Sequence, residues 1–159
     1  FEGDLKKGIL LRGNVESGKT LLMKIFSRLM RRTPKRFGIV TTRSIVAKFN
    51  ERGTEALKDY GKESYYRNQF NYPDKSKPIC RCIDDLGAES IGMHFGNKFD
   101  VIGEIIQDRE EEFMTTGMVT HFTTNLKAEE LEHHYGKRIR SRLKRMCNML
   151  TLNCEKGRA

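Results

Sequence analysis

The feature that most constrains this chain is a complete phosphate-binding loop. Residues 13–20 read Gly-Asn-Val-Glu-Ser-Gly-Lys-Thr, which fits the pattern G-x-x-x-x-G-K-[ST]. Such a loop functions between a buried strand and the N-terminus of a helix. Residues 8–11 form a short apolar run that predicts the strand. After the loop, apolar residues recur at helical spacing: Leu21, Leu22, Ile25, Phe26, Leu29 and Met30.

The loop motif predicts the ligand as well as the fold. Its backbone N–H groups surround the phosphates of a nucleotide, and the positive end of the helix dipole faces them. Lys19 is expected to reach the β- and γ-phosphates, and the Thr20 hydroxyl to bind Mg²⁺. We therefore expect bound ATP to contact the loop and the first helical turn: Gly13, Asn14, Val15, Glu16, Ser17, Gly18, Lys19, Thr20 and Leu21.

Strands and helices alternate along the rest of the chain. Further strands are predicted at 37–42, 79–83, 118–124 and 148–152. The intervening segments read as helices: one with Ser44 as its N-cap, a long one ending at Gly117, and a helical pair broken near Gly136. Residues 53–77 are polar and predict only a short helix and a loop. This order predicts an α/β fold with a five-stranded parallel sheet and helices on both faces.

Polar residues follow three of the predicted strands and should meet at one edge of the sheet. Asp84 and Asp85 follow the third strand, and Asn125 follows the fourth. Asp84 is expected to hold Mg²⁺ with Thr20, largely through water. Asp85 could orient or deprotonate an attacking water, and Asn125 could position that water near the γ-phosphate.

A basic segment lies near the C-terminal end of the sequence. Residues 137–145 read Lys-Arg-Ile-Arg-Ser-Arg-Leu-Lys-Arg, and as a helix they place Arg138, Arg142 and Arg145 in one stripe. One hypothesis is an arginine finger that reaches a neighbouring subunit's nucleotide. The alternatives are contacts to a DNA backbone and a solvated basic face.

Composition narrows the class of partner. Lys and Arg total 30 against 21 Asp and Glu, a net charge of +9 that favours a nucleic acid or another polyanion. No apolar run approaches the roughly 18 residues of a membrane span. Zinc is disfavoured by the spacing of Cys80, Cys82, Cys147 and Cys154, which we interpret as buried free thiols of a reducing cytoplasm.

Taken together, these residues resemble an AAA+ ATPase of the DnaC/IstB-like helicase-loader group. The resemblance rests on the phosphate-binding loop, on Ile-Asp-Asp-Leu-Gly-Ala-Glu at 83–89, on Thr-Thr-Asn-Leu at 123–126 and on residues 135–143. It implies a P-loop NTPase core with ATP between subunits of a homo-oligomer. Asn125 corresponds to the sensor-1 residue and Arg142 to the arginine finger, with Arg138 as second choice. The implied role is loading a replicative helicase onto single-stranded DNA, or assisting a transposase.

Three departures from the group's pattern lead us to expect slow, assembly-dependent hydrolysis. Glu16 stands where the group usually has Gly, and Asp85 is one methylene shorter than the Glu of many AAA+ proteins. The helical lid after the fifth strand is nearly absent, and Arg158 is only a weak match to the sensor-2 arginine. We expect residues 1–159 to be the ATP-binding domain, with a partner-binding region and most of the lid outside this chain.

Residues 44–77 fall where the group often inserts a helix that touches DNA or guides filament geometry. Tyr65, Tyr66, Phe70 and Tyr72 occur among Lys62, Arg67 and Lys75, a mixture that suits stacking on unpaired bases or, alternatively, covering a small core. Four functions stay open at this point. They are a helicase loader, a transposition helper that binds duplex DNA, a small P-loop kinase, and a nucleotide-gated DNA clamp with little hydrolysis.

Overall fold

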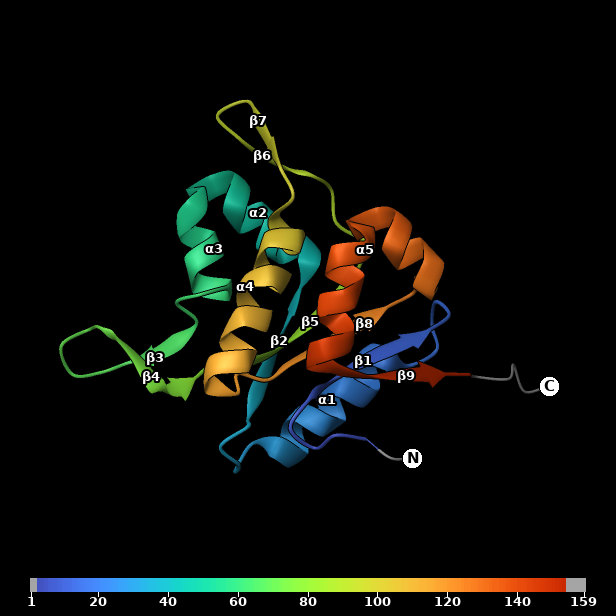
Figure 1. Ribbon diagram of the computed structural model, residues 1–159, viewed down its shortest axis with the longest axis horizontal. Helices are drawn as coiled ribbons and strands as arrows, with labels where there is room; N and C mark the ends of the chain where they lie inside the picture. The colour runs from blue at the N-terminus through green and yellow to red at the C-terminus, as the bar shows by residue number, and fades with distance from the viewer. Residues whose placement is uncertain (1–2, 154–159) are drawn as a thin grey trace.

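The fold is built on a parallel sheet of five strands, as the sequence predicted. The structure, a computed structural model, describes residues 3–153 (Figure 1). All neighbouring strands of this sheet are parallel. Their spatial order is β2 (Phe37–Thr41), β5 (Cys80–Leu86), β8 (Thr120–Thr124), β1 (Gly8–Gly13) and β9 (Cys147–Leu152).

Helices cover both faces of the sheet, but unevenly. One face packs against α1 alone, and the other packs against the remaining four helices (Figure 1). No helix among residues 3–153 has the length and apolar character needed to cross a bilayer. The helices are α1 (Lys19–Met30), α2 (Thr42–Arg52), α3 (Thr54–Tyr60), α4 (Val101–Thr116) and α5 (Ala128–Met146).

Alternation along the strands divides the core into two layers. Leu10, Ile83 and Phe122 face the four-helix layer, because each belongs to the cluster formed with α2, α4 and α5. The opposite layer, toward α1, contains Leu11 of β1 and both Cys80 and Cys82 of β5. The prediction that these two cysteines share a face is confirmed. Burial raises the pKa of the Cys82 thiol, which therefore stays protonated.

Only part of the apolar stripe of α1 is buried. Met23 lies fully inside, and Phe26 and Met30 pack partly against the sheet. The remaining large apolar side chains of this helix are exposed: Leu21, Leu22, Ile25 and Leu29. The helical spacing of these residues is thus real, but half of the stripe faces away from the sheet.

Two short hairpins were not predicted. The first pairs β3 (Tyr65–Arg67) with β4 (Pro73–Pro78), and the second pairs β6 (Gly92–His94) with β7 (Asn97–Phe99). Both project away from the main sheet (Figure 1). Their strands are short and mostly exposed, so they lack the apolar alternation that identifies a strand in a sequence.

Helix ends follow local backbone chemistry. α4 ends at Gly117, which adopts a φ of 72°, and α5 is interrupted at Gly136, with a φ of 84°. Both features were predicted, because glycine enters this left-handed region without steric cost. The predicted N-cap of α2 was wrong by three residues. Thr41 caps the helix by accepting a hydrogen bond from the backbone N–H of Ser44.

A buried arginine joins the four-helix layer to the sheet. The guanidinium of Arg109 on α4 donates to the carbonyl oxygens of Tyr60 and Ile79, at 2.9 and 3.0 Å, and to the hydroxyl of Thr120. Burial, together with the nearby charge of Arg81, lowers the pKa of Arg109 to about 9. The side chain still carries its charge near neutral pH, and it fixes the end of α3 against β8.

Candidate nucleotide-binding site

The loop between β1 and α1 takes the conformation that a phosphate cradle requires. Gly18 precedes the helix with a φ of 85°, where a side chain would be strained. At Gly13, a Cβ atom would lie 2.7 Å from the Ser17 hydroxyl and 2.8 Å from the Leu152 carbonyl oxygen. The two glycines of the motif are therefore needed for different reasons, one for backbone conformation and one for close packing.

Lys19 folds back across this loop. Its ammonium group donates to the carbonyl oxygens of Gly13 and Asn14, at 2.9 and 2.7 Å, and to the side-chain oxygen of Asn125, at 2.6 Å. The side chain is almost wholly buried. The predicted phosphate ligand and the predicted sensor residue are thus in direct contact, although they are far apart in sequence.

The two predicted magnesium residues also contact each other. The Thr20 hydroxyl donates to the carboxylate of Asp84, at 2.9 Å from its nearer oxygen. Thr123 on β8 donates to the same carboxylate at 2.6 Å and accepts a hydrogen bond from the backbone N–H of Asp85. Asp84 is thereby fixed between the first turn of α1 and the neighbouring strand.

A β-bulge allows adjacent aspartates to serve one site. Successive strand residues normally point to opposite faces, so Asp84 and Asp85 would diverge in a regular strand. The pairing of β5 with β8 shifts between Ile83 and Leu86, where β5 has one residue more than β8. Asp85 adopts a φ of 63° within this bulge and lines the hollow in front of the phosphate-binding loop. Bulges commonly re-aim side chains in this way beside active sites.

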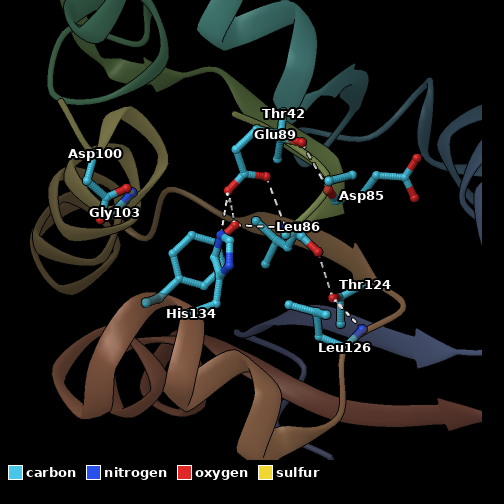
Figure 2. A network of polar contacts seen from close by, with 12 residues as sticks. Thr42, Asp85, Leu86, Glu89, Asp100, Gly103, Thr124, Leu126 and His134 are labelled. Atoms are coloured by element: carbon cyan, nitrogen blue, oxygen red, sulfur yellow. Dashed lines mark hydrogen bonds and ion pairs between the residues drawn. The ribbon is translucent and has the colours of Figure 1, made fainter. Parts of the chain in front are cut away.

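Hydrogen bonds from neighbouring elements hold the bulge. Thr42 on α2 donates to the carbonyl oxygen of Asp85, and Thr124 donates to that of Leu86 (Figure 2). Beyond the bulge, the N–H of Gly87 donates to the Tyr135 hydroxyl and to Glu89. Tyr135 also donates to Glu89, and burial beside this carboxylate raises the pKa of the tyrosine. The end of β5 is therefore connected to α5, next to the interruption at Gly136.

These groups surround a hollow whose size and chemistry fit a nucleotide with Mg²⁺. Its volume is about 350 Å³, within the usual range for ligand sites. Thr20 and Asp84 present the hydroxyl and carboxylate oxygens that Mg²⁺ prefers. The predicted loop residues from Val15 to Leu21 line it, together with Asp85 and Asn125.

The chain is similar in fold to solved structures of known proteins. A DnaC helicase loader aligns over 96% of this chain and 82% of its own, with 19% identity and a TM-score of 0.63. DnaI aligns over 99% of this chain and 77% of its own, with 25% identity and a TM-score of 0.65. The chain has the AAA+ fold of the DnaC-like helicase loaders. Neither a protein-family model nor a curated protein matches the sequence itself.

Two predicted catalytic residues lie away from the nucleotide hollow of their own chain. Arg142 and Arg138 occupy the second half of α5, and neither lines the hollow. Arg142 is ion-paired with Glu110 on α4, and Arg145 contacts the other oxygen of that carboxylate at 2.7 Å. Arg138 is exposed. The sensor-2 candidate Arg158 lies outside the described residues.

The aromatic segment divides into a buried and an exposed part. Tyr65 is buried and its hydroxyl donates to Glu112, so of the two alternatives for this ring the structure supports covering the core and not stacking on bases. Lys62 pairs with Asp108 on α4 rather than accompanying the rings. The other three rings are exposed, as stacking requires: Tyr66, Phe70 and Tyr72.

Sequence reasoning missed the residues that support the site. Thr42, Thr123 and Glu89 all contact the Asp84–Gly87 segment, but no role was predicted for them. A signal existed for Thr123, which lies in the Thr-Thr-Asn-Leu string at the end of the neighbouring strand. Thr42 reaches the bulge through a tertiary contact that no local spacing encodes. Glu89 lies only two residues beyond Gly87, within the Ile-Asp-Asp-Leu-Gly-Ala-Glu string at 83–89, so a local signal existed for it as well.

Proposed function

We propose that this protein is an ATP-binding and ATP-hydrolysing AAA+ ATPase that acts in DNA replication as a DnaC-like helicase loader on single-stranded DNA. The observation that carries the proposal is the convergence of Lys19, Thr20, Asp84 and Asn125 through hydrogen bonds. The similarity in fold to a DnaC helicase loader and to DnaI supports the same role. The net charge of +9 suits a nucleic-acid partner.

The proposed reaction is attack of water on the γ-phosphorus of ATP, with cleavage of its bond to the β-phosphate oxygen. When the nucleotide binds, the contact between Lys19 and Asn125 breaks, which frees the side chain of Asn125 to orient the water. Asp85 accepts the proton of that water. Lys19 then neutralises charge on the γ-phosphate. Thr20 and Asp84 would hold Mg²⁺, which when bound neutralises phosphate charge.

The proposed site is completed by a neighbouring copy of the chain in a homo-oligomer. Neither Arg142 nor Arg138 lines the hollow of its own subunit, which supports action in trans. Arg142 is the first candidate for the arginine finger and Arg138 the second. A replicative helicase in the cytoplasm is the proposed protein partner.

A nucleotide-gated clamp with little hydrolysis is the second candidate. The observation that favours it is the pair of left-handed residues in the site, Glu16 and Asp85, each with a φ of 63°. Asp85 also has a shorter side chain than glutamate, so its carboxylate extends less far toward a water at the γ-phosphate. In this version ATP binding alone would change the affinity for DNA.

The first test measures Mg²⁺-dependent ATP hydrolysis per subunit over a wide range of protein concentration, with and without single-stranded DNA. A per-subunit rate that rises with concentration, and further with DNA, is the expected result. A measurable rate that stays constant would contradict completion of the site by a neighbour. ATP binding without hydrolysis at any concentration would favour the clamp.

Three variants assign the roles of residues within this test. Lys19→Ala should abolish ATP binding, and Arg142→Ala should preserve binding but stop turnover. Asp85→Asn should lower turnover about 100-fold or more and preserve binding, because asparagine tolerates the left-handed backbone and only the base is lost. Undiminished activity of Arg142→Ala would eliminate this residue as the finger and leave Arg138 as the candidate.

A further inference from the structure

A second concave surface lies at the end of the sheet opposite the nucleotide site. It is a hollow of about 340 Å³ whose floor includes Phe37 and Cys80, the first residues of β2 and β5. The phosphate-binding loop follows the last residue of β1, a parallel strand, so the two hollows occupy opposite edges. We call the second one the arginine hollow, after Arg28, Arg31 and Arg36 in its wall.

Three positive charges converge on the arginine hollow without a carboxylate among them. Arg28 lies in the last turn of α1 and Arg31 follows that helix directly. The negative end of the helix dipole accounts for arginines in these two places. It does not account for Arg36, which comes from the loop before β2 and lines the same hollow. Within residues 3–153, none of the three guanidinium groups forms an ion pair.

An aromatic ring completes the wall. Tyr66 on β3 is 39% exposed, and the guanidinium carbon of Arg36 lies 5.0 Å from the centre of its ring. The Tyr66 hydroxyl also accepts a hydrogen bond from Nε of Arg36 at 3.3 Å, so a polar contact and a cation–π contact join the two side chains. The floor is open at Gly38, where even an added Cβ atom would meet nothing within 4 Å. A planar ring and a row of guanidinium groups thus face the same space.

The hairpin that carries Tyr66 offers two more rings. Phe70 and Tyr72, near the turn between β3 and β4, are 71% and 69% exposed. Exposed rings beside cations can stack on successive bases without regard to sequence. Bases offer free faces only when they are not stacked within a duplex. The rings therefore favour a single strand over a duplex, and an acidic peptide would leave them without a planar partner.

We propose that the arginine hollow binds single-stranded nucleic acid, with its guanidinium groups on the phosphates and Tyr66 stacked on a base. The proposal rests on the DNA-binding part of the proposed function and goes further by naming a surface. The strand would contact the edge of the sheet opposite the ATP. Changes in the hollow should therefore affect nucleic-acid binding while leaving ATP binding intact.

The first experiment is a salt titration of binding to a fluorescently labelled oligothymidylate, followed by anisotropy, with and without ATP. The test variant is Arg28→Gln/Arg31→Gln, which changes two exposed side chains of the hollow. We expect its affinity to fall at least several-fold. The slope of log affinity against log salt should decrease by about 1.4, which is about 0.7 for each lost phosphate contact with a single strand.

A matched control removes the same charge elsewhere. Lys98→Gln/Lys127→Gln changes two exposed cations that lie on β7 and just before α5, outside the basic segment 137–145, and should leave the slope unchanged. Calorimetric titration with ATP checks that each variant keeps a folded nucleotide site. If the arginine variant keeps wild-type affinity and slope, the hollow is not the binding site and the proposed function survives. If the wild-type protein binds no oligonucleotide with or without ATP, the DNA-binding part of the proposed function fails as well.

A second experiment reports on Tyr66 directly. The sequence contains no tryptophan, so Tyr66→Trp places a single tryptophan in the hollow, whose emission can be excited selectively. Its emission should be quenched by oligothymidylate and restored by salt. Equal quenching by inorganic phosphate or by thymidine monophosphate would overturn the proposal in favour of a pocket for small anions. Equal quenching by a duplex would overturn the assignment to single strands.

Discussion

Two residues of the nucleotide site adopt a backbone conformation that normally requires glycine. Glu16 in the phosphate-binding loop and Asp85 in the β5 bulge both have a φ of 63°. For a residue with a side chain this region costs on the order of 1–2 kcal/mol, although aspartate tolerates it better than most. The AAA+ group that the sequence resembles usually has Gly at the position of Glu16. The left-handed backbone at this position is the physical reason, because glycine adopts it without steric cost.

Replacing Glu16 should separate the effect of backbone strain from that of charge. We expect Glu16→Gly to raise the melting temperature by about 2 °C, because relief of strain exceeds the added entropy of the unfolded chain, roughly 0.5–1 kcal/mol. Glu16→Gln keeps the strain and should leave the melting temperature unchanged. Both variants remove a carboxylate from the phosphate hollow and should bind ATP several-fold more tightly.

Differential scanning calorimetry without nucleotide and calorimetric titration with ATP give the two readouts. A lower melting temperature for Glu16→Gly would mean that the glutamate side chain makes contacts worth more than the strain. Unchanged ATP affinity in Glu16→Gln would mean that the carboxylate points away from the phosphates.

At the level of secondary structure, α5 has two halves with different neighbours. Gly136 interrupts the helix, and Tyr135 just before it contacts Glu89 and Gly87 at the end of β5. The second half carries Arg142, which pairs with Glu110 on α4. The side chain of Glu110 is 7% exposed and that of Arg142 is 22% exposed, so this pair is shielded from water on most sides. The packing of α4 against α5 therefore orients the proposed finger.

Removing the charge of Glu110 keeps Arg142 in the chain but takes away its ion-pair partner, so it tests whether the orientation of Arg142 matters for turnover. We expect Glu110→Gln to lower the turnover of the assembled protein about tenfold while leaving the affinity for ATP unchanged. Its free energy of unfolding should fall by roughly 1–2 kcal/mol, because the pair is only partly buried. Hydrolysis at high protein concentration and denaturant unfolding measure the two effects.

The control for this variant is Arg145→Gln. Arg145 contacts the same carboxylate but has a side chain that is 54% exposed, so its loss should change stability and turnover little. Equal losses of turnover in the two variants would mean that the pair of Glu110 with Arg142 has no special role in orienting the finger. Unchanged turnover in Glu110→Gln would remove orientation by α4 from the mechanism.

The elements that the sequence predicted are those with a buried, regular pattern. The five strands of the sheet and the break at Gly136 follow from apolar runs and from glycine chemistry. The β5 bulge was not predicted, because it depends on how β5 pairs with β8. For the same reason the motifs gave Asp84 and Asp85 their roles but could not reveal the support from Thr42 and Thr123.

On the scale of the whole molecule, the face of the sheet beneath α1 contains a buried titratable group. His121 on β8 contacts Phe37 and Phe26, and its Nδ1 atom accepts a hydrogen bond from the N–H of Ile9. Burial, with the nearby charges of Arg109 and Lys35, lowers its pKa to about 4. The ring is therefore neutral in the folded protein at pH 6, where an unfolded histidine with a pKa near 6.5 is mostly protonated.

The fold should lose stability in mild acid through His121. Between about pH 6.5 and pH 4 the unfolded state binds more protons than the folded state, so the free energy of unfolding falls as the pH falls. The contribution is on the order of 3 kcal/mol across this window. His121→Asn keeps an acceptor for the Ile9 N–H and should flatten this part of the profile, measured by urea unfolding at several pH values.

His133→Asn is the matched control for the acid profile. His133 is exposed, so its removal should leave the slope between pH 5 and 6.5 unchanged. Identical slopes in wild type and His121→Asn would show that other groups cause the loss of stability in acid.

The position of β1 between β8 and β9 also has a consequence for biosynthesis. β1 emerges from the ribosome before its partners in the sheet, which come from residues 120–124 and 147–152. The phosphate-binding loop leaves β1 at Gly13, which lies beside Leu152 of β9. In a nascent chain the phosphate-binding loop is therefore synthesised well before the strands that complete its site. The proposed binding of ATP would therefore require translation through β9, so nucleotide uptake would mark the completion of this unit rather than its beginning.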